Sequence, residues 1–203
     1  MNGTFRSAVI LSLITLTACV SAGKVWPEQS GIVLDGDTRQ PIEGAIVVAR
    51  WIGTLSLLVD SQTTCYHVES GTTDAQGRYR IPAWAKMPGK VGHNEVQFTA
   101  YKAGYVHTRT DRVTGDQYLR RDERGVKERL EYLDHTAVFC PDADESMQKL
   151  LPLYKAMYAE ANSLAKTSEE RIEALYHLKR IEILEVGSDE AWRRFRERQR
   201  EFK

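Results

Sequence analysis

The distribution of glycine divides this 203-residue chain into two parts that favour different secondary structures. Residues 30–140 are rich in Gly, Thr, Val and Tyr and carry turn signals at short intervals, which is typical of short antiparallel strands. Residues 141–203 contain a single glycine, Gly187, and consist largely of Glu, Leu, Arg, Ala and Lys, which favour helix. We therefore predict a β domain over residues 30–140 and a helical extension over residues 141–203.

The amino-terminal segment resembles the signal peptide of a bacterial lipoprotein. Arg6 and the free amino group supply positive charge, residues 8–16 form an apolar core, and the Leu-Thr-Ala-Cys run that ends at Cys19 resembles a lipobox. The core is too short for a permanent span, which needs roughly 20 apolar residues. The resemblance implies removal of residues 1–18, attachment of lipid with acyl chains such as palmitate to Cys19, and a tether over residues 19–29.

An ordinary cleaved secretory signal is the alternative, and either signal takes the protein out of the cytoplasm. Val20 follows the cysteine where an aspartate favours inner-membrane retention in many diderm bacteria. We therefore expect a lipid anchor in the cell envelope, in the outer membrane where there is one, facing the periplasm or the surface. Lys and Arg number 28 and Asp and Glu also number 28, so the chain lacks the basic character of a nucleic-acid-binding domain.

Cys65 and Cys140 remain as a pair once Cys19 carries lipid. Each flanks a predicted strand, and exported proteins fold in an oxidising compartment, so we predict a disulfide between them. A metal site is the alternative. Cys65, His67 and Glu69 alternate along one predicted strand and could face the same side as ligands.

Turn motifs define the predicted strands of the β domain. Gly36 can take positive φ in the first turn, and Gly44 opens a run long enough for a core strand. An Asp-Ala-Gln-Gly sequence has the form of a hairpin turn. The predicted elements are a turn at 35–37, a strand over 45–51, a hairpin turn at 74–77, a half-buried strand over 96–101, a turn at 102–105 and a strand over 106–110.

Three sequence motifs follow one another in a characteristic order: Gly31–Asp35 with Pro41–Val47, Thr73–Tyr79, and Val96–Tyr101 with Ala103–Tyr105. Together they resemble the carboxypeptidase regulatory-like domain over roughly residues 30–110. The resemblance implies a transthyretin-like or Ig-like β-sandwich of about seven strands that serves as a binding module. Gly44, Gly77 and Gly104 lie where its turns need positive φ.

Two long connections depart from this family pattern, residues 52–71 and residues 82–95. The second contains Trp84, which we expect to be exposed. An exposed aromatic patch is a common feature of binding surfaces, so Trp84 and Tyr105 are the predicted binding residues.

The extension is predicted to form three helices. The first runs from Asp142 or Asp144 to about Lys166 and is limited or kinked by Pro152; the second begins at a Thr167–Glu170 capping box and ends near Val186. The third follows Gly187, with Ser188 as its cap, and has an aromatic face (Trp192, Phe195, Phe202, with Gln199) and an arginine-rich reverse. That reverse either contacts anionic lipid head groups or is the solvated side of a helix packed on the β domain.

Catalytic motifs are missing from the sequence. None of the five histidines (His67, His93, His107, His135 and His177) begins a His-x-x-Glu or His-Glu-x-x-His pattern. A nucleophile elbow, a phosphate loop and the Tyr-Arg-Gly-Ser ending of hydroxyisourate hydrolase are also missing.

The sequence therefore predicts a non-catalytic envelope lipoprotein, without cofactor or metal, that binds a protein or a glycan. Three alternatives stay open: a periplasmic hydrolase with its site in the two long connections, an accessory subunit of an envelope enzyme, and a subunit of a secretion assembly that docks through its helical tail.

Overall fold

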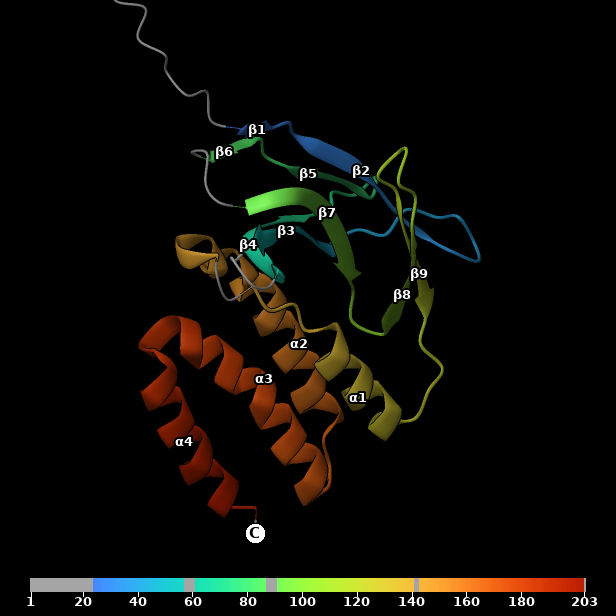
Figure 1. The fold of residues 1–203 in the computed structure, drawn as a ribbon. Helices are drawn as coiled ribbons and strands as arrows, with labels where there is room; N and C mark the ends of the chain where they lie inside the picture. The colour runs from blue at the N-terminus through green and yellow to red at the C-terminus, as the bar shows by residue number, and fades with distance from the viewer. Residues whose placement is uncertain (1–23, 57–60, 87–90, 141–142, 203) are drawn as a thin grey trace, which may run out of the picture.

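The computed structural model describes residues 24–56, 61–86, 91–140 and 143–202 (Figure 1). The predicted signal peptide, with Cys19 and Val20, lies outside these ranges. The described part is a mixed α and β structure with a carboxy-terminal helical segment. Its elements are β1 Lys24–Trp26, β2 Gln29–Asp35, β3 Ile46–Ser56, β4 Ser61–Thr72, β5 Arg78–Ile81, β6 Trp84–Lys86, β7 Val91–Tyr101, β8 Tyr105–Thr110, β9 Gln117–Arg121, α1 Val126–Thr136, the 3₁₀ helix η1 Asp144–Leu150, α2 Leu151–Leu164, α3 Ser168–Val186 and α4 Ser188–Arg200.

The strands form three sheets. The first has the order β5-β2-β9-β8, the second has the order β4-β3-β7, and β1 pairs with β6. β2 and β9 are parallel, whereas the other pairs are antiparallel. The predicted hairpin turn at 74–77 is present as a tight turn, in which the Gly77 N–H donates to the Asp74 carbonyl at 2.8 Å. It does not close a hairpin, because β4 and β5 belong to different sheets.

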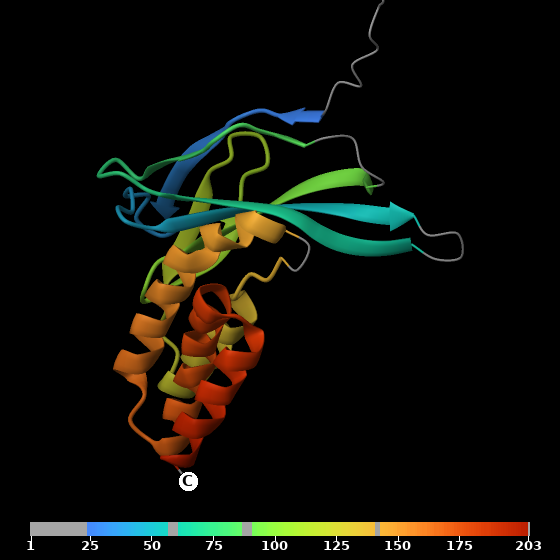
Figure 2. The same cartoon turned by 90° about the vertical axis from the view of Figure 1, so that its left-hand side faces the viewer.

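The three-stranded sheet lies between the four-stranded sheet and the helices (Figures 1 and 2). Successive residues of β3 point to opposite faces, as strand geometry requires. Val47 and Trp51 join a buried cluster with residues of the four-stranded sheet, such as Leu119. Ile46 and Val48 join a second cluster with helix residues. β3 is therefore apolar on both faces over residues 46–49, which lie within the predicted core strand over 45–51.

The helical part begins earlier than the sequence predicted. α1 lies at residues 126–136, inside the segment assigned to strands, and buries Leu130 and Leu133 against the sheet. Next, η1 precedes α2, and Pro152 lies in the first turn of α2, where its missing N–H costs no helical hydrogen bond. Pro152 therefore marks the beginning of a helix rather than a kink inside one.

The other local predictions concern turns and caps. The capping box is confirmed: the Thr167 hydroxyl accepts from the Glu170 N–H, and the Glu170 carboxylate accepts from the Thr167 N–H. Positive φ is confirmed at Gly44, Gly77 and Gly104. In the first turn Arg39, and not Gly36, has positive φ, and the Asp35 carboxylate accepts from the N–H groups of Asp37 and Thr38. Among the described helices, none is both long and apolar enough to span a membrane.

Candidate binding groove beside strand β7

The two edges of the three-stranded sheet differ. The outer edge of β4 is covered by η1 at residues 68–70: the Val68 N–H donates to the Ser146 hydroxyl at 3.1 Å, and the Ser70 hydroxyl donates to the Lys149 carbonyl at 2.6 Å. β7, at the other edge, pairs only with β3 among the described strands. The backbone groups on its outer side are therefore available to a further strand.

A cavity of about 760 Å³ lies along this open edge. One wall is β7 itself, and the others are the beginning of β2 and the loop that joins β8 to β9. The lining residues are Glu28, Gln29, Ser30, Arg50, Glu95, Val96, Gln97, Phe98, Thr110, Asp111, Arg112, Val113, Thr114 and Gly115. We call this cavity the β7 groove.

The β8–β9 loop forms a well-defined wall of the groove. The Asp111 carboxylate accepts from the N–H groups of Val113 and Thr114, which also lowers the pKa of Asp111. At the base of the loop, the Gly115 carbonyl accepts from the Tyr79 hydroxyl at 2.6 Å and from the Gln117 amide at 2.7 Å. These bonds hold the loop in one conformation and leave the side chain of Val113, 95% exposed, at its tip.

Arg50 is the residue of the groove with an unsatisfied polar atom. It follows Val48 on the helix-facing side of β3, where its Nε atom is buried and no described residue accepts a hydrogen bond from it. Arg50 also lines a second cavity of about 230 Å³, whose other lining residues are Thr99, His107, Tyr132, His135, Thr136, Ala137 and Val138. We call this second cavity the Arg50 pocket.

The aromatic residues predicted to bind lie elsewhere. Trp84 is half-buried, not exposed, and its ring stacks on His67 with the centroids 3.6 Å apart. The pairing of β1 with β6 brings Trp26 next to Trp84, with the ring centroids 6.3 Å apart. Tyr105 begins β8 and is also half-buried, beneath the guanidinium group of Arg121. β6 and β8 lie at opposite ends of the β domain (Figure 1), so Trp84 and Tyr105 do not form one patch.

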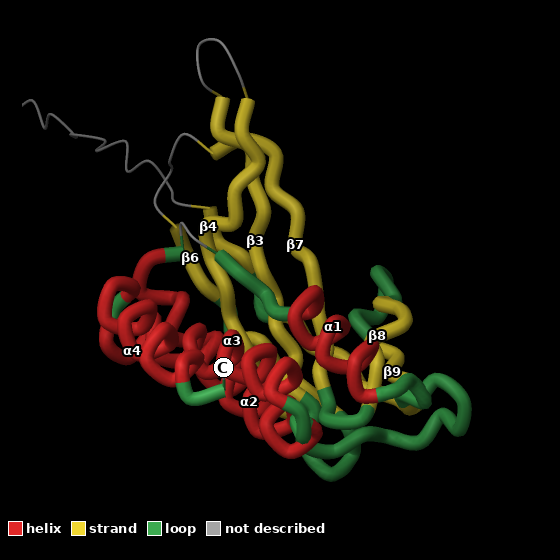
Figure 3. Tube along the Cα trace, turned by 90° about the horizontal axis from the view of Figure 1, so that it is seen from below, coloured by secondary structure: helices red, strands yellow, loops and turns green. Residues whose placement is uncertain are grey.

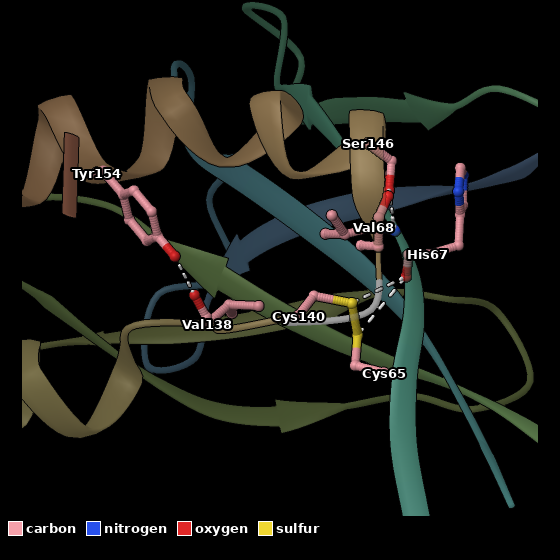
Figure 4. The surroundings of a disulfide bond; sticks show 8 residues. Cys65, His67, Val68, Val138, Cys140, Ser146 and Tyr154 are labelled. Carbon is pink, nitrogen blue, oxygen red and sulfur yellow. Dashed lines mark hydrogen bonds between the residues drawn. A yellow bond between two sulfur atoms is a disulfide. The ribbon is translucent and has the colours of Figure 1, made fainter. Parts of the chain in front are cut away.

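The structure joins Cys65 and Cys140 in a disulfide, with Cα atoms 4.8 Å apart (Figure 4). It attaches the segment after α1 to β4. Close by, the Tyr154 hydroxyl donates to the Val138 carbonyl at 2.6 Å, which fixes the same segment against α2.

The alternative of a metal site at Cys65, His67 and Glu69 does not fit this arrangement. The strand register shifts between Cys65 and His67, which directs the Cys65 side chain into the helix-facing cluster and the His67 ring against Trp84. His67 Nε2 lies 3.5 Å from a Glu69 carboxylate oxygen. Among the described residues no group of three potential ligands occurs.

The remaining histidines separate into two environments. His107 and His135 both line the Arg50 pocket, and burial lowers the pKa of His107. His177 lies between the helices, where burial lowers its pKa to about 4. The side chain of His93 is outside the described part of the structure.

The arginine-rich helix α4 packs on α3 through its buried Phe195 (Figure 3). Its arginines form ion pairs: Arg193 with Glu190 and Glu197, Arg194 with Glu190, and Arg198 with Glu182. Because these carboxylates pair with three of the arginines, the arrangement favours a packed, solvated helix over a lipid-binding face. The helix packs on α3, however, and not on the β domain as predicted.

Comparisons with known proteins add little to this geometry. No family model matches the chain, and no curated protein matches it at a significant level. A solved structure of a 9R-lipoxygenase from Cyanothece is similar at 11% identity and a TM-score of 0.23, over 85% of this chain and 28% of the lipoxygenase chain. The chain thus spans under a third of that protein, and a likeness at this TM-score carries no argument about fold or function.

Proposed function

We propose that this chain is a non-catalytic lipoprotein of the cell envelope that binds an extended segment of a partner protein in the β7 groove. Its β domain is a transthyretin-like sandwich of the carboxypeptidase regulatory-like type. Two sheets of four and three strands share one buried cluster, which supports the sandwich, and positive φ at Gly44, Gly77 and Gly104 supports the family type.

One observation carries the proposal: the edge of β7 is open onto a cavity while the edge of β4 is covered. Exposed strand edges invite aggregation, and natural proteins normally cover or blunt them. An extended polypeptide satisfies such an edge by adding a strand, with backbone hydrogen bonds for affinity and side-chain contacts for selectivity. A glycan lacks the regular backbone donors and acceptors of a strand, so the open edge favours a protein partner.

Site-specific cross-linking in intact cells tests the groove. A photoreactive amino acid at Val113, at the groove rim, should give a defined adduct, whereas the same amino acid at Val186, at the end of α3, should not. Filling the groove from another wall with Ser30→Trp should abolish the adduct, and the surface control Ala75→Trp should keep it. An adduct unaffected by Ser30→Trp contradicts the proposal. An adduct with a glycan instead of a protein would show that the partner is a glycan.

Lipid anchoring has a separate test. Cys19→Ala should move the protein from the membrane fraction into the unprocessed or released pool, because the thiol is the site of lipid attachment. Val20→Asp should shift the anchored protein toward the inner membrane. Wild-type fractionation of Cys19→Ala after a carbonate wash would exclude the anchor and leave the groove proposal untouched.

The rival function, a periplasmic hydrolase, is favoured by one observation: His107 and His135 line the same pocket. The described lining of that pocket contains no carboxylate, and its hydroxyl groups belong to two threonines and Tyr132. A histidine base normally needs an orienting acceptor and an adjacent nucleophile. Hydrolysis of a peptide, ester or glycan by the purified protein, lost in His107→Ala, would establish the rival.

A further inference from the structure

The Arg50 pocket has the composition of an anion site. Arg50 supplies a permanent positive charge, and Thr99, Tyr132 and Thr136 supply hydroxyl groups. The described lining of this pocket contains no carboxylate, whereas Glu28, Glu95 and Asp111 line the adjoining β7 groove. The Tyr132 hydroxyl oxygen accepts from the His107 N–H at 2.7 Å, so its own hydrogen is free to be donated to a ligand.

The buried Nε–H of Arg50 lacks an acceptor within the described structure. A buried polar atom without a hydrogen bond costs about 1–3 kcal/mol, and more when the group is charged. Such atoms are rare in native proteins, and a bound ligand, ion or water is one of the arrangements that satisfies them. The carboxyl end of α1 also reaches this wall, but the Ala137 N–H lies within hydrogen-bonding distance of the carbonyls of Leu133 and Asp134. The negative end of that helix is therefore partly satisfied.

Because Arg50 lines both cavities, a segment in the β7 groove passes directly beside it. We propose that Arg50 binds a carboxylate of the partner segment, with the Arg50 pocket as its subsite. This inference rests on the proposed function and specifies the partner: an extended segment that carries either an acidic side chain or its own carboxy terminus at the position of Arg50.

The Arg50 Nε–H resonance of the purified mature lipoprotein, labelled with ¹⁵N-arginine, reports directly on this site. Three probes separate the possible sources of the carboxylate. They are N-acetylglutamate amide, with a side-chain carboxylate; N-acetylalanine, with a terminal carboxylate; and N-acetylglutamine amide, the neutral isostere. We expect a saturable shift with at least one carboxylate and none with the isostere. A linear shift, or equal shifts with the isostere, overturns the proposal.

Variants locate the site and separate this inference from the proposed function. Charge-assisted hydrogen bonds predict that Arg50→Gln weakens carboxylate binding about tenfold to hundredfold. Arg196→Gln, which removes an exposed arginine of α4 outside both cavities, should leave it unchanged. A Val113 adduct that survives in Arg50→Gln but disappears in Ser30→Trp overturns the carboxylate subsite and keeps the groove. Loss of the adduct in Arg50→Gln, with retention in Arg196→Gln, supports both.

Discussion

Arg129 on α1 and Arg50 on β3 both lie where the helices meet the strands, yet their surroundings are opposite. The Arg129 guanidinium donates to the Glu160 carboxylate at 2.8 and 3.1 Å, to the Asp122 carboxylate at 2.8 Å and to the Tyr105 carbonyl at 2.6 Å. The Nε atom of Arg50 is buried and has no acceptor among the described residues.

The difference separates a structural charge from a binding charge. Glu160 also accepts from the Tyr101 hydroxyl and from the Gly104 N–H, so the Arg129 network joins α1 and α2 to the turn between β7 and β8. Hydrogen bonds from Arg124, and then from Arg129, hold the pKa of Asp122 well below its usual range. A network so fully satisfied leaves nothing for a ligand, whereas the Arg50 Nε–H has no acceptor among the described residues.

The largest effect expected is from Arg129→Met. It leaves Glu160 buried without its charged partner and Asp122 with Arg124 alone, and breaking a buried pair in this way costs about 3–5 kcal/mol of unfolding free energy. Arg124 binds the same Asp122 but is 40% exposed, so Arg124→Met should cost no more than about 1 kcal/mol. Urea unfolding measures both, and equal losses would contradict the distinction between a buried and a surface charge.

Removing the disulfide tests how the wall of the Arg50 pocket is held in place. The disulfide closes a loop across 75 residues, so Cys65→Ala/Cys140→Ala should lower the unfolding free energy by up to about 4 kcal/mol. Val138, in the wall of the Arg50 pocket, lies next to this attachment. Amide exchange at residues 137–140 should therefore accelerate more than exchange around Arg129. A uniform acceleration would mean that the disulfide stabilises only the whole fold.

Sequence patterns predicted the features that depend on near neighbours. The capping box at Thr167, the core strand over 45–51 and the glycines with positive φ each follow from a few adjacent residues. The spacing of Val126, Leu130 and Leu133 also fits a helix, so α1 carried a usable signal that the β-rich surroundings outweighed.

Features that depend on distant segments were not predictable in this way. The hairpin form of 74–77 gives no sign that the two flanking strands enter different sheets. Trp84 is half-buried because β1, far away in the sequence, brings Trp26 against it. Arg50 belongs to no motif; only the packing of α1 and the course of β7 leave its guanidinium group beside two cavities.

His177 offers a pH-dependent test of how the helices hold a buried base. Its Nδ1 accepts from Arg180 at 3.2 Å, and burial keeps the folded pKa at about 4, below the unfolded value of about 6.5. As the pH falls from about 6.5 to 4, His177 binds a proton in the unfolded chain but stays largely neutral in the folded chain. The unfolding free energy should then drop by about 3 kcal/mol.

The His177→Gln variant should lose most of this pH dependence, whereas His135→Gln, at an exposed position, should retain it. Unfolding titrations at pH 7 and pH 4.5 provide the measurement. If the unfolding free energy of His177→Gln depends on pH as strongly as that of the wild type, the effect arises from Asp134 or from another carboxylate of the helices.

The smallest expected effect has the opposite sign. Arg50→Met removes a buried donor that has no partner and leaves an unbranched apolar chain on the sheet face, so the unliganded protein should gain about 1 kcal/mol of unfolding free energy. The same substitution should abolish carboxylate binding, since the methionine thioether donates no hydrogen bond. This pairing of higher stability with lost binding is typical of a residue kept for a ligand. A loss of stability comparable to that of Arg129→Met would show instead that Arg50 holds the fold together.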